Sequence, residues 1–352
     1  MFDIYLPIAE VFINAPLLLL ISTIVGLLTG MLGIGGGFLM TPILIFFGIP
    51  PIYAVANGAN NILAASVSGT LAHYFKGQLD LKMGALILVG GIVGSIIGIE
   101  IFNYFLNEGS INNIISILFF GLLTLVGLSM LFESLSEIRR IKNRRFIRRK
   151  LHKHYWIHNL PFKTRIRSSK LYISVIPPIF FGTLIGLLSS ILGVGGAFLL
   201  VPILIYIIGM PAKLVPGTSL LAMIFVMIGV TLLHALQNNT IDFYLVLILV
   251  LGSVTGAQIG TYINIKMKGE QLRAILSVVV LGCGLKFGYD LFQQKIIPAV
   301  NITNLKGPIE LNSFSQGLIN ISNQNPEIYA ILSITVAIVL GIIVAYSFKK
   351  LF

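Results

Sequence analysis

The chain of 352 residues is 56% hydrophobic and only 10% charged, and its mean hydropathy is +0.96. Because a soluble domain carries about 25% charged residues, this composition excludes a soluble globular protein and indicates an all-α polytopic integral membrane protein. The single cysteine, Cys283, excludes an internal disulfide framework and a cysteine-based metal site. We expect neither a metal nor a cofactor.

Apolar stretches of about 20 residues can cross a bilayer, and they form two groups of five. The first transmembrane repeat, 1–134, is predicted to hold helices at 11–33, 37–48, 54–75, 83–106 and 111–133. After a basic cytoplasmic linker at 135–170, the second repeat, 171–292, is predicted to hold helices at 171–193, 197–209, 214–236, 242–265 and 270–292. An extracytoplasmic polar loop, 293–326, precedes one extra C-terminal transmembrane helix within 327–352.

A glycine-rich signature occurs twice, 160 residues apart, as "GLLTGMLGIGGGFLMTPILI" (Gly26–Ile45) and "GLLSSILGVGGAFLLVPILI" (Gly186–Ile205). The segments that follow each signature, 37–48 and 197–209, are short for a full crossing, which favours broken or re-entrant helices. Further on, three glycines spaced by four recur, a pattern that lets another helix approach closely: Gly90, Gly94, Gly98 and Gly252, Gly256, Gly260.

The charges predict which side each loop occupies. Between the two repeats, 135–170 holds 13 of the 24 basic residues, which favours a cytoplasmic loop that contacts anionic lipid over an RNA or regulatory partner. If this linker is cytoplasmic, the N-terminus is predicted to lie outside the cytoplasmic membrane and the C-terminus on its cytoplasmic side. Each repeat then has an odd number of crossings, so the two repeats have inverted topology, and inverted repeats place a substrate site near the midplane.

The repeated G-x-G-G-[GA]-F-L-x-x-P-x-L pattern, together with "VPGTSLLA" (Val215–Ala222) and the later glycine-rich helices, resembles the sulfite exporter TauE/SafE family. The resemblance covers about Leu17–Phe292 and leaves 293–352 outside it. It implies a carrier for small sulfur-containing or organic anions, often an exporter. One departure is that Ala56-Asn57-Gly58 stands where the second repeat has Gly217-Thr218-Ser219, so the substrate is not carried over.

The glycines of the signature are the first candidates for substrate binding. A glycine-rich break exposes backbone N–H groups, and a half-helix that starts behind it directs its positive end to the break. Close helix crossing is the alternative explanation for the same residues. The candidates are Gly33, Gly35, Gly36 and Gly37 in the first repeat and Gly193, Gly195 and Gly196 in the second.

Neutral polar side chains inside the apolar segments are the second group. Asn57, Asn61, Thr218 and Ser219 carry hydrogen-bond donors for an anion, or else hold helices together. His73 and His234 are matched between the repeats and are candidates for proton coupling, since histidine titrates near neutral pH; an interfacial, hydrogen-bonded role is the alternative.

Together these features predict a secondary transporter, an exporter by resemblance, that moves a small anion such as sulfite or a sulfonate by alternating access. A passive anion channel and a membrane scaffold that acts through its basic linker are the alternatives. The chain lacks the sequence motifs of hydrolases and metalloenzymes, so we do not expect an enzyme. The expected partners are the anion, membrane lipid and a coupling proton or ion, without nucleic acid, and a homo-oligomer is compatible with the sequence.

Overall fold

The computed structural model describes residues 3–32, 38–142, 161–166, 168–211, 213–264, 269–293 and 313–349. The first repeat contains β1 (Asp3–Leu6), β2 (Val11–Asn14), α1 (Ala15–Leu32), α2 (Met40–Phe46), α3 (Pro51–Phe75), α4 (Leu81–Asn107) and α5 (Ile111–Lys142). The second contains β3 (Lys163–Ile166), β4 (Leu171–Ser174), α6 (Ile176–Leu192), α7 (Ala197–Pro202), the π-helix η2 (Ile203–Ile207), α8 (Val215–Asn238), α9 (Phe243–Asn264) and α10 (Gly269–Phe292). Two helices follow, α11 (Ser313–Gln324) and α12 (Pro326–Lys349).

The prediction of an all-α polytopic membrane protein is confirmed. Within the described part of the chain, five helices are long and apolar enough to cross a membrane: α4, α5, α8, α9 and α12. Two details of the prediction are wrong. Residues 11–14 and 171–174, predicted as helix, are strands that pair with β1 and β3 in two antiparallel hairpins, so the helices behind them begin at Ala15 and Ile176. The predicted loop 293–326 contains helix α11.

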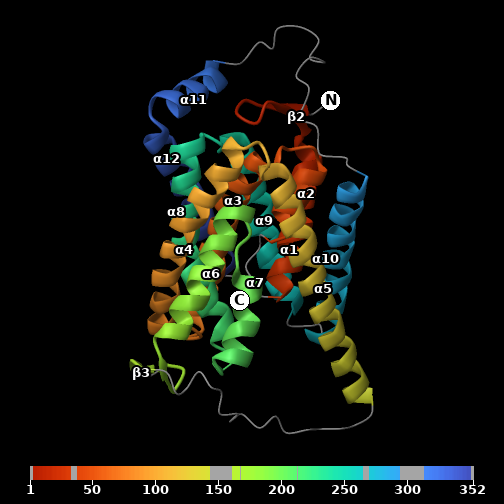
Figure 1. The fold of residues 1–352 in the computed structure, drawn as a ribbon, viewed down its shortest axis with the longest axis vertical. Helices are drawn as coiled ribbons and strands as arrows, with labels where there is room; N and C mark the ends of the chain where they lie inside the picture. The colour runs from red at the N-terminus through yellow and green to blue at the C-terminus, as the bar shows by residue number, and fades with distance from the viewer. Residues whose placement is uncertain are drawn as a thin grey trace.

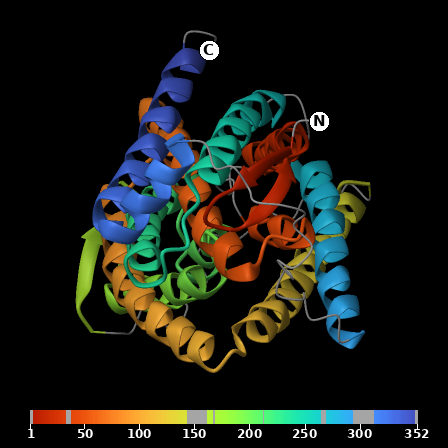
Figure 2. The same ribbon diagram turned by 90° about the horizontal axis from the view of Figure 1, so that it is seen from above.

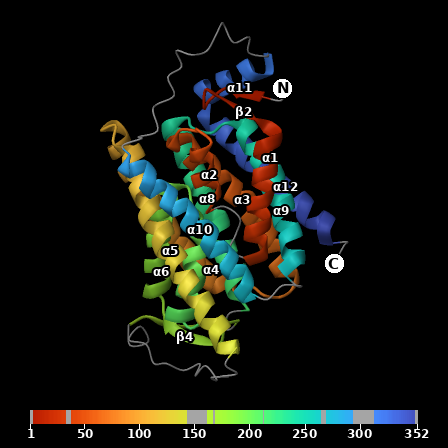
Figure 3. The same ribbon diagram turned by 90° about the vertical axis from the view of Figure 1, so that its right-hand side faces the viewer.

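The two repeats exchange helices around a pseudo-two-fold axis. Helix α1 of the first repeat packs along α9 of the second, and α6 of the second packs along α4 of the first. The remaining large contacts join equivalent helices, α3 with α8 and α5 with α10 (Figure 1, Figure 3). Each half of the fold is therefore built from elements of both repeats.

Glycines make the two exchanged contacts close, as the spacing predicted. A Cβ on Gly94 of α4 would lie 2.0 Å from the carbonyl oxygen of Thr183 in α6. The equivalent Gly256 of α9 would place a Cβ 2.1 Å from the carbonyl oxygen of Thr23 in α1. Only hydrogen at these positions lets the backbones approach so closely.

The hairpins occupy equivalent places at opposite ends of the molecule, with β2 at one end and β3 at the other in Figure 1. The turn of each hairpin is held by an aspartate of the other repeat. This aspartate caps the N-terminus of α9 at one end of the molecule and of α4 at the other. At one end the Asp242 carboxylate accepts hydrogen bonds from the N–H groups of Ile8 (2.9 Å) and Ala9 (3.4 Å) in the first hairpin. At the other end the Asp80 carboxylate accepts from the N–H of Ser169 in the second hairpin (3.0 Å). The hydrogen bonds of Asp242 and Asp80 are therefore related by the inverted symmetry of the two repeats.

The extra C-terminal helix α12 lies on the opposite side of the molecule from the α5–α10 pair (Figure 2). It packs against α3, α8 and α9 and thereby touches both repeats. Its Tyr329 hydroxyl accepts a hydrogen bond from the Phe243 N–H (3.1 Å) at the start of α9. A Cβ on Gly341 would lie 2.7 Å from the Ala64 carbonyl oxygen of α3, so the contact with α3 is a close one.

Candidate substrate-binding centre

The second glycine-rich break separates helix α6 from helix α7. Helix α6 ends at Leu192, and Gly193 follows in the left-handed conformation with φ 61°. Its N–H donates to the Ser189 carbonyl (2.8 Å), and the Ser189 hydroxyl donates to the Val194 carbonyl (3.0 Å). Behind the break, α7 and η2 together span 197–207, about 16 Å at helical rise, roughly half of a bilayer core of about 30 Å. The predicted half-helix is confirmed here.

The first break, with Gly33, Gly35, Gly36 and Gly37, lies outside the described residues, but its downstream edge is described. Phe38, which follows it, stacks on Phe198, the equivalent residue behind the second break, with ring centroids 4.8 Å apart and planes at 25°. The Thr41 hydroxyl of α2 donates to the Gly193 carbonyl (3.1 Å). The segments behind both breaks therefore meet where the repeats face each other.

Space around the second break allows only glycine. A Cβ on Gly193 would lie 2.2 Å from the Val55 carbonyl oxygen of α3, and one on Gly195 would lie 2.7 Å from the Ile62 side chain. Gly193, Gly195 and Gly196 are all buried. Close crossing, which the sequence left open as an alternative, is thus a real function of these glycines.

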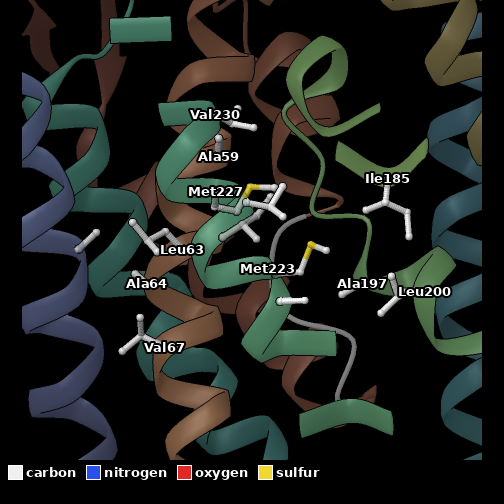
Figure 4. Close-up of a cluster of buried hydrophobic side chains, with 14 of the residues drawn as sticks. Ala59, Leu63, Ala64, Val67, Ile185, Ala197, Leu200, Met223, Met227 and Val230 are labelled. Carbon is white, nitrogen blue, oxygen red and sulfur yellow. The ribbon is translucent and has the colours of Figure 1, made fainter. Parts of the chain in front are cut away.

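Apolar side chains line the space between the break and the central helices. Figure 4 shows Ile185, Ala197 and Leu200 on the side of α6 and α7, facing Met223 and Met227 of α8. These side chains offer no hydrogen bonds apart from weak sulfur acceptors. A polar substrate at this place would depend on backbone groups of the break and on the few neutral polar side chains nearby.

Asn57 and Thr218 occupy equivalent positions in the two repeats, and the side chain of each forms hydrogen bonds with other residues of the protein. The Asn57 carbonyl accepts from the Asp242 N–H (2.9 Å), and its amide donates to the carbonyls of Thr240 (3.1 Å) and Tyr53 (2.7 Å). The Thr218 hydroxyl accepts from the Asp80 N–H (3.0 Å) and donates to the Leu214 carbonyl (2.7 Å).

These contacts place the two side chains at opposite ends of the molecule, each beside a capping aspartate that also holds a hairpin. The structure therefore does not bring Asn57 and Thr218 together, and their contact with substrate stays a prediction. Burial raises the pKa of the Asp242 carboxyl above its ordinary value, while four backbone N–H donors act in the opposite direction. Neither aspartate was predicted from the sequence as a site residue.

Ser219 and Asn61 lie deeper in their helices and are fully buried. The Ser219 hydroxyl donates within α8, to the carbonyls of Val215 (2.9 Å) and Pro216 (3.1 Å). The Asn61 carbonyl of α3 accepts from the Ser253 hydroxyl of α9, while its amide nitrogen has no partner among the described residues. Of the four neutral polar candidates, Asn61 is the one with a free donor.

The two matched histidines have different surroundings. His73 is partly exposed, and its Nδ1 lies 3.3 Å from the Gln78 side-chain oxygen. His234 is fully buried; its Nε2 donates to the Ser190 carbonyl near the end of α6 (2.8 Å), and its ring meets the Phe102 ring edge to face. His234 therefore ties α8 to the helix that ends at the second break, and proton coupling by either histidine stays a prediction.

Within the described residues, no three His, Cys, Asp or Glu side chains gather as a metal site would require. The chemistry of the centre is that of neutral donors, acceptors and backbone.

Comparison with known proteins places the chain among membrane transporters. A family model described as sulfite exporter TauE/SafE matches residues 18–287. The probable membrane transporter protein YjnA of Bacillus subtilis is 27% identical over 270 residues, which cover 76% of this chain and 98% of that protein. The probable membrane transporter protein MJ0441 of Methanocaldococcus jannaschii is 25% identical over 289 residues, 78% of this chain and 96% of that protein. No solved structure matches.

Proposed function

Because the chain belongs to the sulfite exporter TauE/SafE family, we propose that it is a secondary transporter that exports a small anion across the cytoplasmic membrane by alternating access between its two inverted repeats. The observation that carries the proposal is the stacking of Phe38 on Phe198. This contact brings the segments behind both breaks together between the repeats, where inverted-repeat transporters bind their substrates.

The aspartate contacts supply the two closures that alternating access requires. At one end Asp242 joins α9 to the first hairpin, and at the other Asp80 joins α4 to the second. Opening one end breaks one of these contacts and leaves the other intact. Each contact joins a hairpin of one repeat to a helix of the other.

The charges of the hairpins support the proposed orientation. The first hairpin carries Asp3 and Glu10, whereas the equivalent positions of the second carry Lys163 and Lys170. Basic residues favour the cytoplasmic side. These charges support an N-terminus outside and a second hairpin inside, next to the basic linker, where anionic lipid is the expected neighbour.

Replacing Gly195 by Leu is expected to abolish anion flux in proteoliposomes while the protein still inserts. A Cβ there already meets Ile62 at 2.7 Å, so a leucine side chain would fill the space behind the break. The matched control is Gly282→Leu, because nothing lies within 4 Å of a Cβ at Gly282. Wild-type flux from a correctly inserted Gly195→Leu variant would contradict the proposed centre.

Flux measurements on the same proteoliposomes distinguish a carrier from a channel. For a carrier, flux saturates, and unlabelled anion on the far side of the membrane accelerates uptake of labelled anion. For a channel, unitary currents are large and no counterflow occurs. Deleting 143–160, between α5 and the second hairpin, tests the scaffold alternative, since a carrier is expected to keep its flux.

A further inference from the structure

Helix α3 carries unused hydrogen-bonding capacity at its middle. Of nine buried side-chain polar atoms without a partner among the described residues, four lie on α3, including Asn60 Oδ1 and Asn61 Nδ2. Both asparagines are fully buried. They are the tenth and eleventh residues of the helix, about 15 Å along it, which is half the thickness of a bilayer core. An unpaired amide group there is costly, and polar groups inside membranes are functional by default.

The other amide atom of each asparagine is fixed by a serine on a neighbouring helix. Asn60 Nδ2 donates to the Ser333 hydroxyl of α12 (3.0 Å), and Asn61 Oδ1 accepts from the Ser253 hydroxyl of α9. Because α9 and α12 also pack against each other, three helices meet at this junction. The two serines orient the asparagines so that one free acceptor and one free donor remain.

The asparagines and Ser253 have no polar counterparts at the equivalent positions of the other repeat. The residues of α8 equivalent to Asn60 and Asn61 are Leu221 and Ala222, and the α4 residue equivalent to Ser253 is Gly91. The family match ends at residue 287, so Ser333 belongs to a helix outside the matched region. The asymmetric set thus joins α3 and α9 to a helix that has no counterpart in the other repeat, and among the described residues it leaves Asn60 Oδ1 and Asn61 Nδ2 free for a ligand.

The charge of the junction limits that ligand. The titratable side chains of α3, α9 and α12 lie within the first or last four residues of those helices, so the junction offers only neutral groups. The cost of burying an ion rises with the square of its charge, and within α3, α9 and α12 no basic side chain lies near the middle of the helix to offset it. An anion with one charge is favoured over one with two.

We propose that Asn60 and Asn61 bind the transported anion as a singly protonated oxyanion, with Ser333 and Ser253 as positioning residues. Asn61 Nδ2 donates to an anionic oxygen, and Asn60 Oδ1 accepts from the remaining O–H of the ligand. This inference rests on the proposed function and adds the protonation state of the substrate and a helix, α12, that takes part in selecting it.

The test measures thermal stabilisation of the purified full-length protein by sulfite, at mildly acidic and mildly alkaline pH, with sulfate as the fully deprotonated comparison. Bound ligand raises the unfolding temperature. We expect sulfite to stabilise the protein in proportion to its hydrogen-sulfite fraction, and sulfate to have no effect. Asn60→Leu and Asn61→Ala, which introduce the residues of the second repeat, are each expected to weaken sulfite binding at least about tenfold.

The positioning residue has its own variants. Ser333→Ala is expected to weaken sulfite binding several-fold, and Ser333→Thr, which keeps a hydroxyl, to restore it. Thr335→Ala is the matched control, since Thr335 is exposed on the same helix and its hydroxyl donates to the Ile331 carbonyl (2.7 Å). These substitutions keep the proposal testable even if an asparagine variant fails to fold.

Wild-type affinity and pH dependence in folded Asn60→Leu would overturn the proposal. So would lower stability of this variant without ligand combined with unchanged sulfite binding, because the asparagine would then be structural. In both cases wild-type flux and counterflow would stand, and the proposed function with them. Absence of both flux and anion binding in the wild type would instead refute the proposed function.

Discussion

Replacing Asp242 by Ala is expected to lower the free energy of unfolding by about 3–5 kcal/mol. Its carboxylate accepts from the N–H groups of Tyr244 (3.1 Å) and Leu245 (3.3 Å) as the cap of α9, and from those of Ile8 and Ala9 in the first hairpin. Alanine leaves these donors without their acceptor in a buried place. The measurement is thermal or denaturant unfolding of the purified protein in detergent.

Asp80→Ala is the internal comparison. Asp80 accepts from two backbone N–H groups, those of Met83 (3.1 Å) and Ser169 (3.0 Å), so its loss is expected to cost about 2 kcal/mol. Asp242→Asn is expected to fall between the two alanine variants, because its carbonyl still caps α9 while its amide opposes the hairpin N–H groups. A larger loss for Asp80→Ala than for Asp242→Ala would contradict this explanation.

Replacing Gly94 by Ala is expected to prevent a stable fold, with a loss of more than about 3 kcal/mol. The new methyl group would lie 2.0 Å from the Thr183 carbonyl oxygen and 2.9 Å from the Leu187 nitrogen. Both are backbone atoms of α6, so no rotamer change relieves the overlap, and the helices must separate. The yield of monodisperse protein and its unfolding temperature report the effect.

Gly256→Ala makes the same change at the symmetric contact and is expected to have a similar effect. Gly121→Ala and Gly282→Ala are the controls, because a Cβ at either position meets nothing within 4 Å. Since alanine favours a helix over glycine by about 1 kcal/mol, these two variants are expected to be neutral or slightly more stable. Equal losses at all four positions would show that helix flexibility, rather than close approach, explains the glycines.

The helices, the second break and the glycine contacts could be predicted because each leaves a strong pattern in the sequence. Long apolar stretches define the crossings, and a spacing of four places Gly90 and Gly94 on one helix face. The duplicated signature located the break at Gly193. These patterns arise from requirements that act on every residue of a segment, such as satisfaction of backbone groups in lipid.

The hairpins and aspartate contacts could not be predicted in this way. The first hairpin, Asp3–Asn14, aligns with the second, Lys163–Ser174, at the 160-residue offset, yet Ile13 and Ile173 are the only identical pair. Their conformation does repeat, since Glu10 and Lys170 both have positive φ, 53° and 54°. The strands have four residues each, too few for an alternating pattern to stand out beside apolar helices.

At the candidate site, the difference in residue type between the two repeats was misleading, because the two residues have the same structural role. Asn57 and Thr218 differ chemically, and their mismatch in the sequence indicated a difference in substrate binding. In the structure both supply an oxygen that accepts the N–H of a capping aspartate. The informative asymmetry is at Asn60 and Asn61. The partner of Asn60, Ser333, lies 273 residues away in the chain. Contacts of that range are set by tertiary packing, which a single sequence does not reveal.

The π-helix η2 explains a slip in the register of the two repeats. Through Ile45 and Ile205 they align at an offset of 160 residues, whereas Thr70 and His73 align with Thr231 and His234 at 161. The extra residue of the second copy enters where η2 (Ile203–Ile207) replaces the regular helix of α2. A π-helix bonds i to i+5 and thus holds one residue more per turn than an α-helix. The extra residue is thus absorbed within η2, and from Gly48 and Gly209, which both have positive φ (84° and 79°), the two repeats stay aligned at 161 as far as His73 and His234.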